Sequence, residues 1–261
     1  MSDEAKVFMG KVSSEQVPRN IEEAILYEHW KIAVYDEMKA LQNNNTWELT
    51  TLPDRKKPVG CKWVFTVKYK ADGTVERYKA RLVAKGYTQT YGIDYQETFS
   101  PVAKLNTIRI LLSLAANLDW PLHQFDVKNT FLHGDLEEEV YMDIPPGFTG
   151  IKGKMVCRLT KSLYGLKQSP RAWFGKFSLA MRKNGFSQSN SDHTLFLKRN
   201  EGRIVALIIY VDNMIVTGND EKGIAELQKY LASEFEMKDL GGLKYFLGIE
   251  VYRSKRGIFL S

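Results

Sequence analysis

The chain has 261 residues, which is long enough for one large domain or two modest ones with a hydrophobic core. Its apolar fraction of 44% and charged fraction of 26% are those of an ordinary globular protein, and no apolar run is long enough to predict a transmembrane helix. The formal charge of +6 favours a polyanionic partner, because basic proteins release counterions when they bind nucleic acid.

Cysteine and histidine usage argues against a disulfide framework and against a metal site built from these residues. The two cysteines, Cys61 and Cys157, are far apart in the sequence, which fits a reducing compartment. The four histidines show no paired metal-ligand spacing. The N-terminus lacks the basic and then apolar pattern of a secretory signal, so no targeting signal is predicted.

The N-terminal part predicts a flexible segment over residues 1–19, followed by a packing helix over residues 21–42. Asn20 and Glu23 have the spacing of a capping box at the start of this helix. One helical face is apolar and is expected to be buried; it consists of Trp30, Ala33, Val34, Met38 and Leu41.

The next segment predicts a basic β-hairpin. Residues 61–70 alternate in the period of a half-buried strand, Asp72-Gly73 is a strong turn signal, and residues 75–87 return as the second strand. Such a basic run is usually a solvated face, and a surface for a polyanion is the alternative; the pattern leaves both open. Its cations are Lys62, Lys68, Lys70, Arg77, Lys79, Arg81 and Lys85.

The middle of the chain predicts a buried helix over residues 105–118 and then a strand within residues 122–127 that ends on Asp126. A short helix or loop follows this strand. The glutamates of residues 135–143 predict a solvated acidic face.

The C-terminal part predicts an amphipathic helix after a glycine turn, three strands and a further helix. The three strands lie within residues 194–218, with turns at 199–202 and 212–213, and the last helix covers residues 221–235. This succession indicates an α+β fold with helices on one face of a sheet. The apolar side of the amphipathic helix is expected to carry Phe174, Phe177, Leu179 and Met181.

Two carboxylates, Asp126 and Asp212, stand at the ends of apolar strands. A buried carboxylate is unfavourable without a partner, whereas one that binds a divalent cation is not. Mg²⁺ prefers one or two carboxylates together with substrate phosphates. A second interpretation stays open, because Asp212-Asn213 is also a good two-residue hairpin turn in which both residues tolerate left-handed backbone angles.

Seven stretches occur together in an order that resembles one protein family. They are "GCKWVF" (60–65), "ERYKARLVAKGY" (76–87), "DYQETFSPV" (94–102), "DVKNTFLHGDLEEEVYM" (126–142), "SLYGLKQSPRAW" (162–173), "YVDN" (210–213) and "FLGIE" (246–250). From about residue 20 to the last residue, the chain resembles the reverse transcriptase of copia-type long-terminal-repeat retrotransposons.

This resemblance implies a right-hand polymerase fold. Residues 20–261 would form the fingers and palm, with an antiparallel palm sheet backed by helices. The basic hairpin would belong to the fingers, and the thumb would be missing or incomplete, which is typical of a polyprotein fragment or a relic reading frame.

The resemblance also implies roles at a catalytic centre. Asp126 and Asp212 match metal-binding aspartates, and the carbonyl of Val127 would add a ligand. Two Mg²⁺ ions, with Mn²⁺ as a possible substitute, would activate a primer 3′-hydroxyl and stabilise the leaving pyrophosphate. Asn213 departs from the family pattern, because a second aspartate is expected there.

The implied substrates are deoxynucleoside triphosphates and an RNA or DNA template-primer. Phe131 matches the steric gate under the sugar, and the Tyr164-Gly165 turn matches the segment that contacts the incoming nucleotide. Lys79 or Arg81 would contact the triphosphate, since a cation there is chemically sensible. The residues that match primer contacts are Tyr210, Phe246, Leu247 and Gly248.

The sequence therefore predicts an RNA-directed DNA polymerase, impaired in this copy by Asn213 and by truncation. The alternatives are a catalytically dead nucleic-acid-binding module and an inert relic of a transposable element. No membrane partner is predicted, and the family implies cytoplasmic virus-like particles.

Overall fold

The computed structural model describes residues 16–70, 72–98, 102–148, 155–254 and 257–261. Residues 1–15 of the predicted flexible segment and Ala71 beside the predicted hairpin turn lie outside this description. The described residues fall into two units, each with sheets of its own. The hairpin unit comprises those of Met1–Thr98 and Asp135–Ser169, and the sheet unit comprises those of Phe99–Gly134 and Pro170–Ser261.

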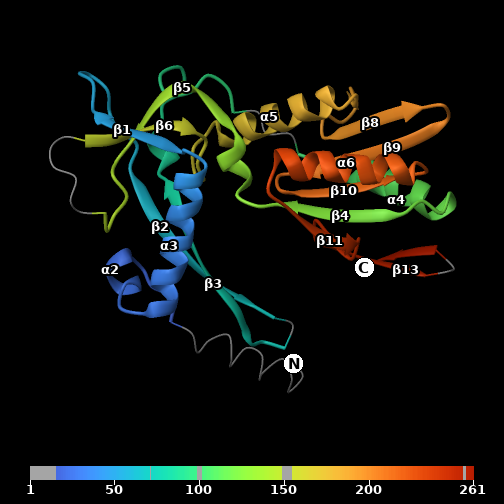
Figure 1. Ribbon diagram of the computed structural model, residues 1–261, viewed down its shortest axis with the longest axis horizontal. Helices are drawn as coiled ribbons and strands as arrows, with labels where there is room; N and C mark the ends of the chain where they lie inside the picture. The colour runs from blue at the N-terminus through green and yellow to red at the C-terminus, as the bar shows by residue number, and fades with distance from the viewer. Residues whose placement is uncertain (1–15, 71, 99–101, 149–154, 255–256) are drawn as a thin grey trace. The chain divides into compact units, whose positions relative to one another are not determined.

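The hairpin unit contains two small antiparallel sheets, with strand orders β1-β6-β5 and β2-β3 (Figure 1). The β2–β3 hairpin is confirmed, whereas the sequence did not predict β1, β5 or β6 as strands. Its elements are α2 (Ile21–Ala24), α3 (Glu28–Asn43), β1 (Trp47–Thr51), β2 (Cys61–Tyr69), β3 (Val75–Ala84), the 3₁₀ helix η1 (Gly86–Thr88), β5 (Asp135–Met142) and β6 (Met155–Lys161).

The helix predicted over residues 21–42 is interrupted, so this prediction is wrong between α2 and α3. Ile21 and Trp30 are nine positions apart, which places them on opposite sides of a continuous helix at about 100° per residue. Both are buried, and the interruption allows both to face the core. Half of the predicted capping box is confirmed, because the Asn20 side chain accepts a hydrogen bond from the Glu23 amide at 2.8 Å. The Glu23 carboxylate accepts from the Arg19 amide at 2.9 Å rather than from the Asn20 amide.

Helix α3 packs on the β2–β3 hairpin through an aromatic cluster. The Trp30 ring lies edge-on to Phe65 at 5.4 Å and to Tyr78 at 4.9 Å between centroids. Every residue predicted for the apolar face of this helix is buried. Glu37 lies on the same face, although it is charged.

Glu37 forms an ion pair with Arg81 of β3. Its side chain is 2% exposed and that of Arg81 is 20% exposed. Burial raises the pKa of the Glu37 carboxyl, and the Arg81 guanidinium opposes this shift. The pair therefore joins α3 to the hairpin. Burying the two charged groups costs desolvation free energy, and their mutual attraction offsets this cost only while both partners are present.

The sheet unit is built on a six-stranded antiparallel sheet of order β11-β4-β10-β9-β8-β7, with a smaller sheet β12-β13-β14. The three strands predicted within residues 194–218 are confirmed as β8, β9 and β10. Its elements are α4 (Leu105–Asn117), β4 (Leu122–Val127), the 3₁₀ helix η2 (Thr130–His133), α5 (Ser169–Lys183), β7 (Ser187–Gln188), β8 (Leu195–Asn200), β9 (Arg203–Tyr210), β10 (Asn213–Gly218), α6 (Glu221–Glu234), β11 (Met237–Gly242), β12 (Tyr245–Phe246), β13 (Ile249–Ser254) and β14 (Gly257–Leu260).

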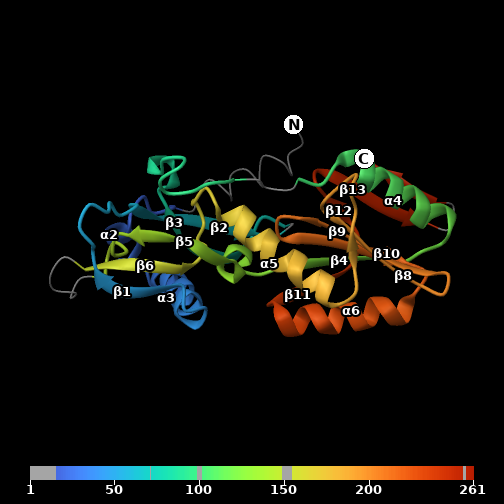
Figure 2. The same ribbon diagram turned by 90° about the horizontal axis from the view of Figure 1, so that it is seen from above.

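Helices cover both faces of the six-stranded sheet, so the prediction of helices on one face is wrong. Helices α5 and α6 pack on the face that carries Phe125 and Val127. Helix α4 and the smaller sheet pack on the other face, with Leu122 and Ile215, and Figure 2 shows α4 and α6 on opposite sides. Double coverage explains why β9 is a continuous apolar run rather than an alternating one.

Two predicted burials are also wrong. Helix α4 buries only one side, because Ile110 is 60% exposed. Leu179 of α5 is 51% exposed, whereas Phe177 and Met181 of the same helix are fully buried. In both cases only one side of the helix contacts the sheet. Apolar residues on the other side of the helix stay exposed.

The two cysteines are free and buried, in agreement with the expectation that the chain has no disulfide framework. Burial raises the pKa of the Cys61 thiol to about 11 and that of Cys157 to about 12. Both are therefore protonated at neutral pH and unreactive in the folded chain. No helix among the described residues is long and apolar enough to span a membrane.

The Glu37–Arg81 pair predicts a large stability change on loss of one partner. Glu37→Ala leaves the Arg81 guanidinium partly buried without its carboxylate, and we expect the free energy of unfolding to fall by about 3 kcal/mol. Denaturant unfolding of the variant measures this change. Glu28→Ala is the matched control, because Glu28 pairs with Lys31 on the exposed side of the same helix and should matter by less than about 0.5 kcal/mol. Equal effects of the two variants would contradict the assignment.

Candidate active site

The pairing of β4 with β10 brings the predicted carboxylates together. Asn213, the first residue of β10, lies directly opposite Asp126 of β4. Asp212 precedes Asn213 in the turn between β9 and β10, and its carbonyl accepts a hydrogen bond from the Val127 amide at 2.8 Å. Two residues that are far apart in the sequence thus occupy one end of the same sheet.

The turn of this hairpin is one residue earlier than predicted. Tyr210 pairs with Asn213, so the two turn residues are Val211 and Asp212 rather than Asp212 and Asn213. Val211 has φ of +56°, a left-handed value that is strained for a β-branched residue and usually belongs to glycine in this position. The expectation that an Asp-Asn turn supplies the left-handed residues is therefore wrong.

A tryptophan that sequence analysis did not single out contacts the same turn. The indole N–H of Trp173, in α5, donates to the carbonyl of Val211 at 2.8 Å. Trp173 is 2% exposed and belongs to the core between α5, α6 and the sheet. The sequence of the "SPRAW" stretch does not predict this contact, because a buried aromatic residue on a helix is most often only a core residue.

Asn213 is engaged with the neighbouring carboxylate. Its side-chain amide donates to Oδ1 of Asp212 at 2.9 Å. Across the sheet, Asp126 is flanked by Asn213 on β10 and by Lys238 on β11, each directly opposite in register. An amide and a cation beside a carboxylate are favourable cross-strand neighbours, whereas a second carboxylate in the position of Asn213 would repel Asp126.

The residues present fit a magnesium ion that also binds substrate phosphates. Asp126 and Asp212 are both half-buried, and one or two carboxylates are the usual protein contribution to Mg²⁺. The carbonyl of Val127 accepts a hydrogen bond from the Thr130 hydroxyl at 2.6 Å, so one of its two lone pairs is engaged. Among the described residues, no group of three or more His, Cys, Asp or Glu side chains is arranged to hold a metal ion without such a substrate.

The predicted steric gate and primer residues belong to the same unit. Phe131 of η2 is partly buried against the core of α5 and α6. Tyr210 and Phe246 pack in the core on the other face of the sheet. Leu247 and Gly248 form the exposed turn between β12 and β13, with φ of +51° and +83°.

Strand β4 holds the β12–β13 hairpin through a further residue that sequence analysis missed. The side-chain amide of Gln124 donates to the carbonyl of Tyr245 at 2.9 Å. Gln124 is two residues before Asp126 and so projects from the same face of the sheet. The face with the candidate metal ligand therefore also carries the hairpin with the predicted primer contacts.

The Tyr164-Gly165 turn lies in the hairpin unit and closely approaches β3. The Ala84 amide donates to the Tyr164 carbonyl at 2.7 Å. Gly165 has φ of +93°, and a Cβ at this position would overlap the Ala84 carbonyl oxygen. Only glycine fits both the backbone angle and the close approach.

The two predicted phosphate contacts differ in their surroundings. Arg81 is paired with Glu37, and its guanidinium lies over the Tyr164 ring at 5.3 Å from the centroid. Lys79 is half-buried, and burial lowers its pKa, as do the nearby positive charges of Arg81 and Arg77. Lys62, Lys68 and Lys70 are exposed, as a solvated face predicts, and so is Arg77.

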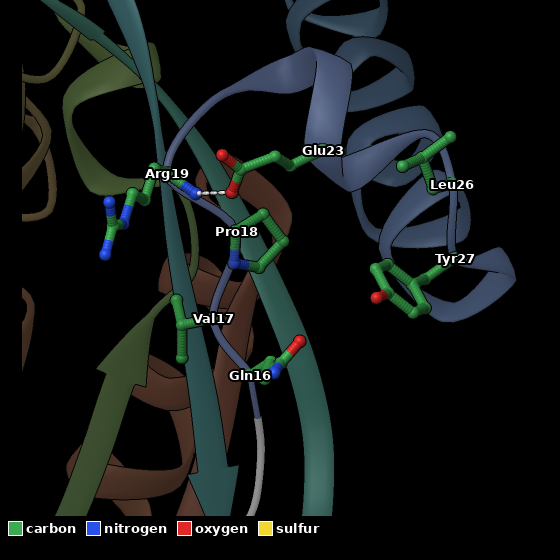
Figure 3. A pocket seen from close by; sticks show the side chains of 7 residues that line it. All are labelled: Gln16, Val17, Pro18, Arg19, Glu23, Leu26 and Tyr27. Atoms are coloured by element: carbon green, nitrogen blue, oxygen red, sulfur yellow. Dashed lines mark hydrogen bonds between the residues drawn. The ribbon is translucent and has the colours of Figure 1, made fainter.

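A pocket of about 430 Å³ lies elsewhere in the hairpin unit (Figure 3). The Arg19 backbone amide donates to the Glu23 carboxylate at 2.9 Å within it. No residue for which the sequence predicts a catalytic or substrate-binding role lines this pocket. The lining residues are Gln16, Val17, Pro18, Arg19, Glu23, Leu26 and Tyr27.

Comparison with known proteins identifies the family. A family model described as "Reverse transcriptase (RNA-dependent DNA polymerase)" matches residues 44–261. The chain is 45% identical over 258 residues to the "Retrovirus-related Pol polyprotein from transposon TNT 1-94" of Nicotiana tabacum, covering 96% of this chain and 19% of that protein. It is 45% identical over 252 residues to the corresponding polyprotein from transposon RE1 of Arabidopsis thaliana, covering 96% of this chain and 17% of that protein.

A more distant relative is the "Transposon Ty1-ER2 Gag-Pol polyprotein" of Saccharomyces cerevisiae, which is 29% identical over 87% of this chain and 13% of that protein. The chain thus spans less than a fifth of the length of each of these three relatives. The family match covers most of the chain and includes the strand that carries Asp126 and the β9–β10 turn that carries Asp212. The chain belongs to the reverse transcriptase (RNA-dependent DNA polymerase) family of retrotransposon Pol polyproteins.

Proposed function

We propose that this chain catalyses RNA-directed DNA synthesis, by transfer of a nucleotide to a primer 3′-hydroxyl at Asp126 and Asp212. The observation that carries this proposal is the register of β4 and β10, which places both carboxylates at one sheet end. Two half-buried carboxylates at one sheet end are the protein ligands that Mg²⁺ prefers, which supports the proposal.

Asp126 and Asp212 are the residues that would hold Mg²⁺ or Mn²⁺, and the Val127 carbonyl is proposed as a further ligand. When bound, such ions lower the pKa of a hydroxyl and neutralise charge on a leaving phosphate. The protein's own part is to fix the direction of the carboxylates and to exclude water on one side of the sheet. The buried aromatic core beneath β4 and β10 supports that part.

The two units are assigned to the parts of a right-hand polymerase. The sheet unit is proposed as the palm, which its antiparallel sheet and carboxylate pair support. The hairpin unit is proposed as the fingers, which its basic β-hairpin supports. Residues 20–261 remain one proposed reverse transcriptase region composed of these two parts.

Substrate contacts follow from the same assignment. Phe131 is proposed as the steric gate, and the Tyr164-Gly165 turn as a contact to the incoming nucleotide. Lys79 is favoured over Arg81 for the triphosphate, because Arg81 is already paired with Glu37. A phosphate beside Lys79 would favour its charged form, which burial disfavours.

The primer is proposed to contact the hairpin of β12 and β13. Leu247 and Gly248 of this hairpin and Tyr210 of β9 are proposed for direct contact, and the buried Phe246 would support the hairpin from the core. The anchoring of this hairpin by Gln124 on the face of Asp126 supports the proposal. The proposed partners are a template-primer duplex and deoxynucleoside triphosphates, and the cytoplasm is the proposed site of action, where buried thiols such as Cys61 stay reduced.

Asn213 favours a second candidate function, a nucleic-acid-binding chain with little or no catalysis. Its amide donates to Asp212 and adds no negative charge for a metal ion. The absence of a charge at this position is expected to weaken metal binding and to slow the chemistry by roughly a hundredfold, which corresponds to about 3 kcal/mol of transition-state stabilisation.

Primer extension on an RNA template tests the catalytic proposal directly. We expect Asn213→Asp to raise the turnover number by roughly a hundredfold with Mg²⁺, and Asp126→Ala to abolish extension in both backgrounds. Asp36→Ala, which removes an exposed carboxylate from α3, is the control and should change nothing. Retained extension by Asp126→Ala would refute the role of this carboxylate. Salt-dependent template binding without extension by Asn213→Asp would support the second candidate.

The same position predicts a divalent-dependent stability that can be measured without activity. The carboxylate introduced by Asn213→Asp would face Asp126 across the strands, so the free energy of unfolding should fall by about 1 kcal/mol in a chelator. Millimolar Mg²⁺ at fixed ionic strength should restore it, because a ligand that binds only the folded chain stabilises it. Asn200→Asp, at an exposed strand end, adds the same charge and should respond to neither condition. A variant that Mg²⁺ leaves unaffected would argue against a metal site here.

Lys79 predicts a specific effect on nucleotide affinity. In the Asn213→Asp background, Lys79→Ala should raise KM for the deoxynucleoside triphosphate by about tenfold, which is the loss of one charge-assisted contact. The turnover number at saturating nucleotide should change much less. Lys68→Ala removes an exposed cation of the same hairpin and serves as the control. Equal effects of both variants would indicate a diffuse electrostatic contribution instead.

A further inference from the structure

We propose that Trp173 is a positioning residue for Asp212: its indole N–H holds the peptide group between Val211 and Asp212 and thereby sets the direction in which the Asp212 side chain leaves the backbone. This inference deepens the proposed function and rests on it for its catalytic consequence. The geometric part stands on contacts within the sheet unit alone.

Both peptide groups that flank Asp212 are held by hydrogen bonds from other elements. The carbonyl of Val211, on the N-terminal side, accepts from Trp173 at 2.8 Å. The carbonyl of Asp212, on the C-terminal side, accepts from the Val127 amide at 2.8 Å. With the two peptide planes fixed, the Cα–Cβ bond of Asp212 has one direction, because only the φ and ψ angles between these planes could change it.

The indole N–H has a fixed direction of its own. The Trp173 ring lies edge-on to Phe235 at 5.1 Å between centroids and contacts Phe177 at 5.6 Å and His133 at 5.8 Å. These rings come from three different segments of the unit. A buried ring that is packed on several sides cannot rotate freely, so its donor points to one place.

The strain at Val211 explains why its backbone needs a hydrogen bond from another element. A β-branched residue with φ of +56° persists only where its surroundings over-determine it. The Val211 side chain is 38% exposed and so contributes little packing of its own. The hydrogen bond from Trp173 acts on the Val211 backbone from the core.

The decisive experiment compares Trp173→Phe with Trp63→Phe. Phenylalanine keeps an aromatic ring in place and removes the donor. Trp63 is the matched control, because it is 5% exposed and its indole N–H donates to the Pro146 carbonyl at 3.0 Å in the hairpin unit. Amide hydrogen exchange is measured over residues 205–216 and, for comparison, over α5 and β8.

We expect Trp173→Phe to accelerate exchange around the Val211-Asp212 turn by about tenfold, the factor that corresponds to loss of one hydrogen bond. Exchange in α5 and β8 should stay within about twofold of the unmodified chain, and Trp63→Phe should leave the turn unaffected. Uniform acceleration across the sheet unit, or no change at the turn, overturns the inference, because either result means that Trp173 only fills the core.

A second replacement separates the donor from the shape of the ring. Incorporation of 3-benzothienylalanine in place of Trp173 preserves the bicyclic ring and replaces the N–H group by sulfur. It should reproduce the exchange of Trp173→Phe, even if Trp173→Phe is too unstable to measure. Exchange equal to that of the unmodified chain would show that ring volume, and not the hydrogen bond, governs the turn.

The catalytic consequence is read from a kcat-against-KM split in the Asn213→Asp background. We expect Trp173→Phe to lower kcat by about tenfold while KM for the nucleotide and affinity for the template-primer stay within about twofold. Trp63→Phe should change neither. If Asn213→Asp shows no polymerase activity, the proposed function fails, whereas the exchange measurements still decide the role of Trp173 at the turn.

Discussion

The antiparallel pairing of β4 with β10 is the constraint on which the rest of the candidate site depends. It sets Asn213 opposite Asp126 and leaves Asp212 in the adjoining turn. Both faces of this sheet are buried, so a slip of one residue would turn every side chain of a strand to the opposite face. The hydrophobic core therefore fixes the position of the carboxylates. The residues that set this position pack in the core and take no part in the chemistry.

The tip of the β9–β10 hairpin shows how a buried core reaches a polar site. Val211 adopts a backbone conformation that its side chain disfavours, and Trp173 and Val127 hold the two carbonyls around Asp212. The two hydrogen bonds together hold the backbone from which the Asp212 carboxylate projects. Asn213 completes this arrangement with an amide where repulsion between carboxylates would otherwise act.

The hairpin unit illustrates that a charged residue in a basic strand need not face a ligand. Arg81 pairs with the buried Glu37 and lies over Tyr164, so it joins helix, hairpin and turn. Lys79, in the same strand, is half-buried among other cations. Both residues are cations of one strand, and they differ because Arg81 forms an ion pair with Glu37 of α3.

The sequence by itself determined the family, because seven motifs occur in the family's order. It also determined the β2–β3 hairpin, the three strands around Asp212 and the helices near 105–117 and 221–234, because periodicity and turn residues act locally. It did not determine the break before Glu28, the strands β1 and β6, or the second helical layer on the sheet, which depend on contacts between distant segments. It named Asp126 and Asp212 and missed Trp173 and Gln124, because an indole or amide donor acquires its role only from the carbonyl that the fold places against it. The β9–β10 turn lies one residue before its predicted position for the same reason. The buried faces on both sides of the sheet set the strand register, and this register overrode the local preference of Asp-Asn for a turn.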